Sequence, residues 1–229
     1  TNVPQYNALN EVFEVKEADG SHAGLMYFDG HPRAGKRAGA WCTSFRRALT
    51  TNDVRTTPLV SIVCNFTPPT GDKPALLTWD EVTTMFHEFG HGLHGLFSLG
   101  EYKRTAGQVA RDFVELPSQI MEHWAAEPQV MKQYARHYLT NEPMPEDLMT
   151  KLQLSSTFNQ GFSTVEYLAA AQLDMKWHSL SANENVSNAD EFEKQTLDKL
   201  GLISEILPRY RSTYFSHIFN GGYSAGYYV

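Results

Sequence analysis

Hydrophobic and polar residues follow two different periods along this chain. Over residues 1 to about 70, short runs rich in β-branched and aromatic residues are typical of strands. The runs are Glu11–Val15, Ala23–Phe28, Ala40–Phe45 and Pro58–Phe66. They predict a small β-sheet at the start of the chain, with the last run as a candidate for an exposed sheet edge.

From Thr78 onward the pattern has a helical period. Capping boxes, in which a Ser or Thr is followed three residues later by Glu, predict helix starts at Thr78 and Ser163. Clusters of proline and glycine separate the helices, and no long polar linker interrupts the chain. We therefore expect one α+β domain over residues 1–229, mainly α, with the small sheet over about 1–70 and helices over 78–229.

The helix that follows Thr78 has an apolar stripe that we expect to face the core. Its residues are Val82, Met85, Phe86, Phe89, Leu93, Leu96 and Phe97. A rotation of about 100° per residue places the three histidines of this helix on the opposite side, with Glu88 beside them. Gly92 and Gly95 project to the side of Glu88, so another element or a substrate could approach the helix closely there.

Two of these histidines belong to a pattern with a known chemical use. His87, Glu88 and His91 form HExxH, with the histidines one helical turn apart. Both imidazoles can therefore bind one zinc ion, while Glu88 is placed to meet a water molecule beside the metal. His94 lies outside this pattern, and we assign it no ligand role.

Catalytic zinc needs a third protein ligand and an open position for water. The pattern HExxHxxGxxH does not fit, because His94 and Phe97 stand where glycine and histidine are required. The alternative is a glutamate from a following helix, and Glu115 and Glu122 both lie on a polar face of the segment QVARDFVELPSQIMEHW. Spacing alone does not choose between them. Asp112 could accept a hydrogen bond from a ligating imidazole.

Composition and charge exclude several classes of partner. The 229 residues are 41% hydrophobic, enough for a substantial core, and carry a net charge of -7 with the basic residues scattered. We therefore expect no nucleic-acid or membrane partner. Gly30–Arg37 is close to a phosphate-binding loop, but Arg37 replaces the required hydroxyl, so a basic turn between strands is the better interpretation. Cys42 and Cys64 are expected to be free thiols, and both cytoplasm and periplasm stay open as compartments.

Five long blocks of this sequence occur together in a known family. They are AGAWCTSF, CNFTPPTGDKPALLTWDEV, FHEFGHGLHGLF, RDFVELPSQIMEHW and RYRSTYFSHIFNGGYSAGYY. The blocks resemble the zinc oligopeptidases related to thimet oligopeptidase and peptidyl-dipeptidase, and among these most of all the bacterial peptidyl-dipeptidases, which are dipeptidyl carboxypeptidases. Family members continue beyond both ends of this chain, so the resemblance implies a catalytic-core fragment of a longer peptidase.

The resemblance implies a zincin-like metallopeptidase core with one zinc ion. It assigns His87, His91 and Glu115 as the metal ligands, and so chooses between the two glutamates that spacing left open. It assigns Glu88 as the general base and acid.

The resemblance also implies roles for the Gly- and Tyr-rich tail. His217 and Tyr223 would bind the substrate and the developing oxyanion, and Tyr227 would be a further substrate contact. The expected function is hydrolysis of short peptides with release of dipeptides from the C-terminus, and the candidate sheet edge could pair with the peptide backbone. Internal cleavage of oligopeptides is one alternative, and a truncated fragment that binds zinc and peptide without turnover is another.

Overall fold

The computed structural model describes residues 3–52, 54–102, 104–203 and 205–228, which divide into two compact units on either side of the Glu146–Asp147 bond. The expectation of a single domain stays a prediction. In the first unit the elements are β1 (Glu11–Lys16), β2 (His22–Asp29), β3 (Trp41–Arg46), β4 (Leu49–Thr51), β5 (Val54–Thr56), β6 (Leu59–Val63), α1 (Trp79–Phe97), the 3₁₀ turn η1 (Arg111–Phe113), α2 (Leu116–Ala125) and α3 (Pro128–Tyr134).

A four-stranded sheet forms the base of the first unit, in the order β1-β2-β6-β3. β6 pairs parallel with β2 and antiparallel with β3, so Ile62 lies between Phe28 and Cys42. The four predicted strands are confirmed, but the prediction that Pro58–Phe66 is an exposed edge is wrong. β6 is an interior strand, buried from Val60 to Val63, and the sheet ends at β1 and β3. A run of β-branched and aromatic residues predicts a strand but not the position of that strand in the sheet.

Hydrogen bonds from Lys36 stabilise the turn between β2 and β3. The ammonium group of Lys36 donates hydrogen bonds to the Asp29 carboxylate and to the backbone oxygens of His31 and Cys64. Burial would raise the pKa of the Asp29 carboxyl, but Arg33 and Lys36 bond to the carboxylate and hold the pKa below its usual range. Gly30–Arg37 is therefore a basic turn between strands, as the sequence predicts.

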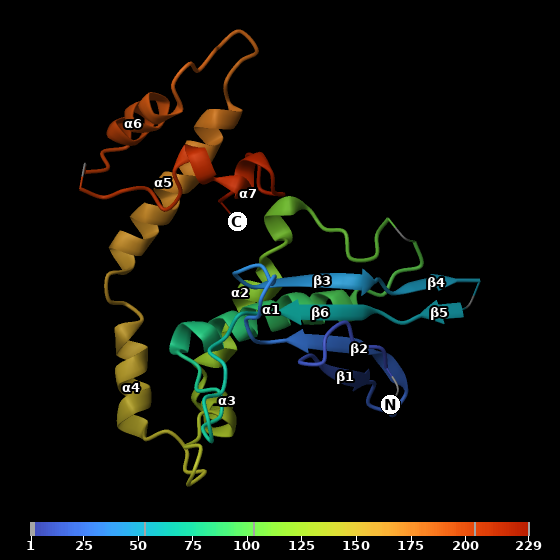
Figure 1. Ribbon diagram of the computed structural model, residues 1–229. Coiled ribbons are helices and arrows are strands. Elements are labelled where there is room, and N and C mark those ends of the chain that lie inside the picture. Colours follow the sequence, from blue (N-terminus) through green and yellow to red (C-terminus); the bar gives the residue numbers. More distant parts are fainter. Residues whose placement is uncertain (1–2, 53, 103, 204, 229) are drawn as a thin grey trace. The chain divides into compact units, whose positions relative to one another are not determined.

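Helix α1 begins with the predicted capping box, in which Thr78 accepts from the Glu81 amide and Glu81 accepts from the Thr78 amide. The helix packs on β6 and β3 (Figure 1). The expected apolar stripe is only partly buried, because Met85 is 39% exposed and Phe97 is 70% exposed. Leu96 of that stripe is buried, and the buried face also holds Glu88 and Gly92, since glycine lets the sheet approach the helix backbone.

Helix α2 follows α1 through the loop that contains η1 and packs along it (Figure 1). Glu115 is its N-cap residue, and Pro117 lies in its first turn. A proline in the first turn costs no hydrogen bond, because the amide groups there have no partner within the helix. Pro117 therefore starts the helix immediately after Glu115 without bending it.

The second unit is helical. Its elements are α4 (Glu146–Ser155), α5 (Gln160–His178), α6 (Ala189–Lys199), the 3₁₀ turn η2 (Ser212–Tyr214) and α7 (Ser216–Phe219). The chain as described is thus a mixed α/β protein with small sheets followed by helices. In the described part of the chain, no helix combines the length and the apolar character that crossing a membrane requires.

Candidate metal centre

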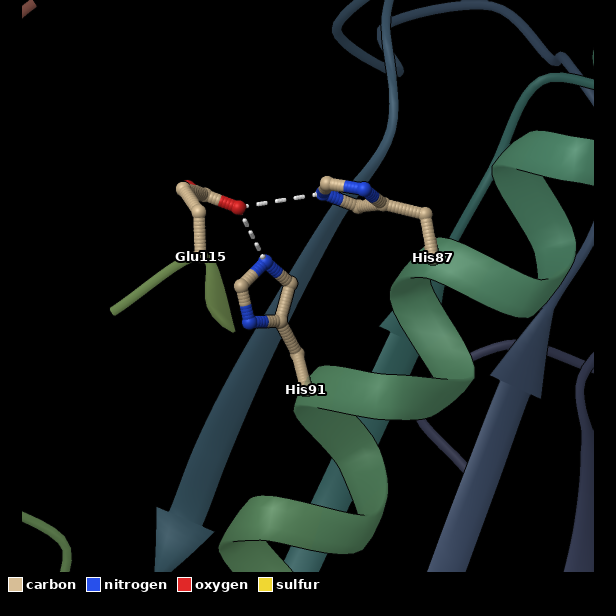
Figure 2. A group of neighbouring side chains, drawn as sticks. All are labelled: His87, His91 and Glu115. Carbon is tan, nitrogen blue, oxygen red and sulfur yellow. Dashed lines mark ion pairs between the residues drawn. The ribbon is translucent and has the colours of Figure 1, made fainter. Parts of the chain in front are cut away.

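Three side chains from α1 and the start of α2 converge on one point. His87 and His91 lie one turn apart on α1, and their ring centroids are 4.9 Å apart. The Oε2 atom of Glu115 lies 3.2 Å from the Nε2 atom of His87 and 3.1 Å from the Nε2 atom of His91. Figure 2 shows the carboxylate facing both rings. Among the described residues this is the group of three with metal-ligand geometry, because its donor atoms all lie within 4.8 Å of one another.

The chemistry of this donor group fits a zinc ion. Zinc bonds of about 2.0–2.2 Å in a tetrahedral arrangement separate two ligand atoms by about 3.3–3.5 Å. The separations between Glu115 and each histidine are close to that value. Two imidazoles and one carboxylate also leave one of four positions open, which is typical of catalytic rather than structural zinc sites.

Glu122 lies on the other side of His87. Its Oε1 atom is 2.6 Å from the Nδ1 atom of His87, so the ring has one carboxylate at each nitrogen. The sequence named Glu122 as a rival ligand and Asp112 as the hydrogen-bond acceptor. The structure instead places Glu122 in the acceptor position. The position of Glu122 on α2 could not be read from spacing, because the path of the loop sets which face of α2 meets α1.

The two carboxylates make the surroundings of His87 strongly favourable to positive charge. Burial lowers the pKa of His87, but Glu115 and Glu122 outweigh it and raise the pKa to about 10. The same arrangement of negative charge stabilises any cation held between the rings and Glu115.

Glu88 is buried on the sheet side of α1. Its side chain is 5% exposed, and its Oε2 atom has no hydrogen-bond partner. Burial raises the pKa of Glu88, while His87 and His91 lower it and Glu115 raises it, with a net increase. A buried carboxylate oxygen without a hydrogen-bond partner is unusual, and such groups are common at functional sites.

Cys42 and Cys64 are both free, as predicted. Burial, and then the charge of Glu88, raise the pKa of each thiol to about 12. Both cysteines therefore stay protonated near neutral pH, and neither belongs to the group of three donors described above.

His94 is not part of the donor group. Its ring packs edge-on against Phe113, with 6.3 Å between the centroids, and Phe113 belongs to η1. His94 therefore lies beside the loop that carries η1, outside the group of three donors.

The tail residues that the sequence singles out lie together in the second unit. The rings of His217 and Tyr227 are 5.8 Å apart, and those of Tyr223 and Tyr227 are 6.5 Å apart. Burial raises the pKa of Tyr227, and the neighbouring Tyr210 raises it further. Tyr227 therefore stays a neutral phenol. The structure brings these three residues together around Tyr227, within their own unit.

Comparisons with known proteins match the whole chain. The family model described as Peptidase family M3 matches residues 1–229. Dipeptidyl carboxypeptidase of Escherichia coli (strain K12) is 46% identical over 229 residues, which are 99% of this chain and 33% of that protein. Saccharolysin of Saccharomyces cerevisiae is 37% identical over 211 residues, 90% of this chain and 29% of that protein. Oligopeptidase A of Haemophilus influenzae is 35% identical over 221 residues, 94% of this chain and 32% of that protein. The chain spans about a third of the length of these relatives.

Proposed function

The chain belongs to peptidase family M3, and on that premise we propose that it is the catalytic part of a zinc-dependent peptidase with a zincin-like core. The observation that supports this most is the convergence of His87, His91 and Glu115 beside the buried Glu88. We propose that these three residues hold one zinc ion. A zinc ion in such a site polarises a carbonyl group and lowers the pKa of a bound water molecule.

Glu88 acts as the proton carrier in this proposal. It takes a proton from the attacking water, whose oxygen forms the new bond to the carbonyl carbon of the peptide. It then delivers that proton to the nitrogen of the leaving amine as the carbon–nitrogen bond breaks. The burial of Glu88 supports this role, because its Oε2 atom has no other hydrogen-bond partner and is available to the water.

The tail residues complete the proposal. His217 and Tyr223 would donate hydrogen bonds to the oxygen that becomes negative, and one such donor is worth roughly 3 to 4 kcal/mol. Tyr227 would contact the substrate. Their grouping around the ring of Tyr227 in the second unit is compatible with one shared binding surface.

The substrates that we propose are short peptides, with release of dipeptides from the C-terminus. The Escherichia coli relative is named a dipeptidyl carboxypeptidase, and its identity of 46% exceeds the 35% of the Haemophilus influenzae oligopeptidase A. The second candidate is cleavage inside oligopeptides, which the name of the latter relative favours.

Replacement of Glu88 by glutamine tests the assignment. The Glu88→Gln protein should keep its zinc and lose turnover of short peptides by about 100-fold or more, because glutamine cannot carry the proton. His94→Gln, on the same helix outside the donor group, is the matched control and should keep both properties. Zinc content is measured by elemental analysis and turnover with a fluorogenic peptide. Full turnover by Glu88→Gln would contradict the proposal.

A fragment that binds zinc without turnover is the remaining alternative. The chain spans about a third of its relatives, and residues outside that third could be needed to complete the substrate site. Hydrolysis by the purified chain that stops with a chelator and returns with zinc would exclude this alternative. Zinc binding with no hydrolysis would favour it.

A further inference from the structure

The backbone of α2 lies very close to α1 at Gly90. A Cβ atom on Gly90 would lie 2.5 Å from the backbone oxygen of Pro117 and 2.6 Å from the Cα atom of Ser118. Neither distance can be relieved by a change of rotamer, because both atoms belong to the backbone of the first turn of α2. Any side chain at residue 90 would therefore push that turn away from α1.

The first turn of α2 holds the carboxylate that faces the histidines. Ser118 is fully buried, and its hydroxyl donates hydrogen bonds to the backbone oxygen of Glu115 at 2.8 Å and to the Oε2 atom of Glu115 at 2.9 Å. That same Oε2 atom lies 3.1 Å from His91 and 3.2 Å from His87. Gly90 thus touches the backbone of the residue whose side chain orients Glu115.

We infer that the contact of Gly90 with the first turn of α2 positions Glu115 for metal binding. The inference rests on the proposed metal centre and adds two positioning residues to it, Gly90 and Ser118. Without a side chain at residue 90, α2 can lie near enough for Glu115 to reach both Nε2 atoms. Ser118 then selects the orientation in which Oε2 faces them.

The other two glycines of the HEFGHGLHG segment differ in what they meet. A Cβ atom on Gly92 would lie 3.1 Å from the Cδ1 atom of Ile62, and one on Gly95 would lie 3.1 Å from a methyl group of Val60. Cβ atoms on both glycines would point toward the sheet, and the atom nearest to the one on Gly92 is the flexible end of the Ile62 side chain. Gly92 therefore offers a matched control, because Gly→Ala there brings the same gain in helix propensity without pushing on α2.

The test compares Gly90→Ala with Gly92→Ala in the whole chain. Zn²⁺ affinity is measured by competition with a chromophoric chelator, and Co²⁺ is bound in place of zinc so that its visible absorption spectrum reports the ligand geometry. Gly90→Ala should bind Zn²⁺ at least about tenfold more weakly and show an altered Co²⁺ spectrum, since displacement of groups around a metal ligand has effects of that size. Gly92→Ala should stay within about twofold of the parent.

Ser118→Ala keeps the inference testable if Gly90→Ala does not fold. This change removes the hydroxyl that orients Glu115 and adds no volume, so Zn²⁺ binding should again weaken while the circular dichroism spectrum is kept. A folded Gly90→Ala or Ser118→Ala protein with the parent affinity and Co²⁺ spectrum would overturn the inference. If the parent itself binds no Zn²⁺, or if His91→Ala binds it as tightly as the parent, the proposed metal centre fails instead.

Discussion

Glu122 contacts the nitrogen of His87 that points away from Glu115. A neutral imidazole has one protonated nitrogen, and a carboxylate 2.6 Å from Nδ1 favours the tautomer with the proton there. The Nε2 lone pair then faces Glu115 and His91, where a metal would be bound. In the proposed metal centre, where His87 would be neutral, Glu122 would therefore hold the Nδ1 proton and leave Nε2 available to the metal.

Removal of Glu122 should weaken the candidate metal centre. We expect Glu122→Ala to bind zinc about 10–100-fold more weakly, which is the usual cost of losing a carboxylate behind a ligating histidine. Glu122→Gln should lose less, because its amide oxygen can still accept from Nδ1. The measurement is a competition titration at fixed pH. Glu127→Ala is the control, because Glu127 is exposed and its side chain makes no capping hydrogen bond to α3. An equal loss of zinc affinity in both alanine variants would contradict the prediction.

Single residues also show what the sequence could and could not predict. HExxH predicts that His87 and His91 share a face, because helical geometry alone sets that relation. Whether Glu115 or Glu122 meets them depends on the path of the loop between the helices, and no local pattern contains that path. The role of Gly90 had a visible signal, since a glycine inside a helix costs about 1 kcal/mol relative to alanine. The sequence does not show what compensates for that cost, because the close contact of Gly90 is with the backbone of α2.

Among the elements, α5 and the tail are joined by one buried carboxylate. Asp174 is fully buried, and its oxygens accept hydrogen bonds from the backbone amides of Ala225, Gly226 and Tyr227 at 2.9 to 3.0 Å. His178, one turn further along α5, lies 2.7 Å from the same carboxylate. The tail loop that carries Tyr227 is therefore fixed to the helix by Asp174.

Loss of this carboxylate should destabilise the second unit. Asp174→Ala leaves three amide donors without their acceptor, and each unsatisfied buried group costs about 1–3 kcal/mol, so we expect a loss of at least about 3 kcal/mol in the free energy of unfolding. Asp174→Asn should lose less, because its carbonyl oxygen still accepts. Urea denaturation measures the loss. Asp198→Ala, which removes an exposed ion pair with Lys194, should cost less than about 1 kcal/mol.

If Asp198→Ala and Asp174→Ala lower the free energy of unfolding equally, the prediction is wrong. The hydrogen bonds from the tail to Asp174 would then add no measurable stability.

The elements were predicted best where one local rule decides them. Short runs rich in β-branched and aromatic residues predicted all four strands of the main sheet, and the Thr78 capping box predicted the start of α1. The capping box at Ser163 is wrong, because α5 begins at Gln160 and the Ser163 amide already donates to the backbone oxygen of Asn159. An interior serine followed by glutamate gives the same local pattern as a helix start. The packing of the neighbouring turn decides between the two.

At the scale of the whole molecule, the proposed residues divide between two units. The donor group and Glu88 belong to the first unit, and His217, Tyr223 and Tyr227 belong to the second. The sequence predicts the family and the two histidines of the donor group because both depend on motifs within short segments, whereas Glu115 is chosen over Glu122 only through the family resemblance. Domain organisation depends on long-range packing, and for that reason the single-domain hypothesis stays a prediction.

The mode of peptide cleavage is a property of the whole molecule, and one comparison separates the two candidates. A dipeptidyl carboxypeptidase should require the free C-terminal carboxylate of its substrate. We therefore expect a peptide with a free carboxylate to be cleaved at least about tenfold faster than the same peptide with a C-terminal amide, a difference of about 1.4 kcal/mol in transition-state binding. Product masses from both peptides provide the measurement. Equal rates with cleavage at internal bonds would favour the oligopeptidase alternative.

The candidate donors are also close together along the chain. They lie between residues 87 and 115, after every strand of the main sheet and before the second unit, which begins at residue 147. Synthesis proceeds from the N-terminus at about 5–20 residues per second, and domains fold in that order. The sheet, α1 and α2 are therefore synthesised before the helices of the second unit. A metal ion bound by the candidate donors would then join α1 to the start of α2 while the second unit is still being made.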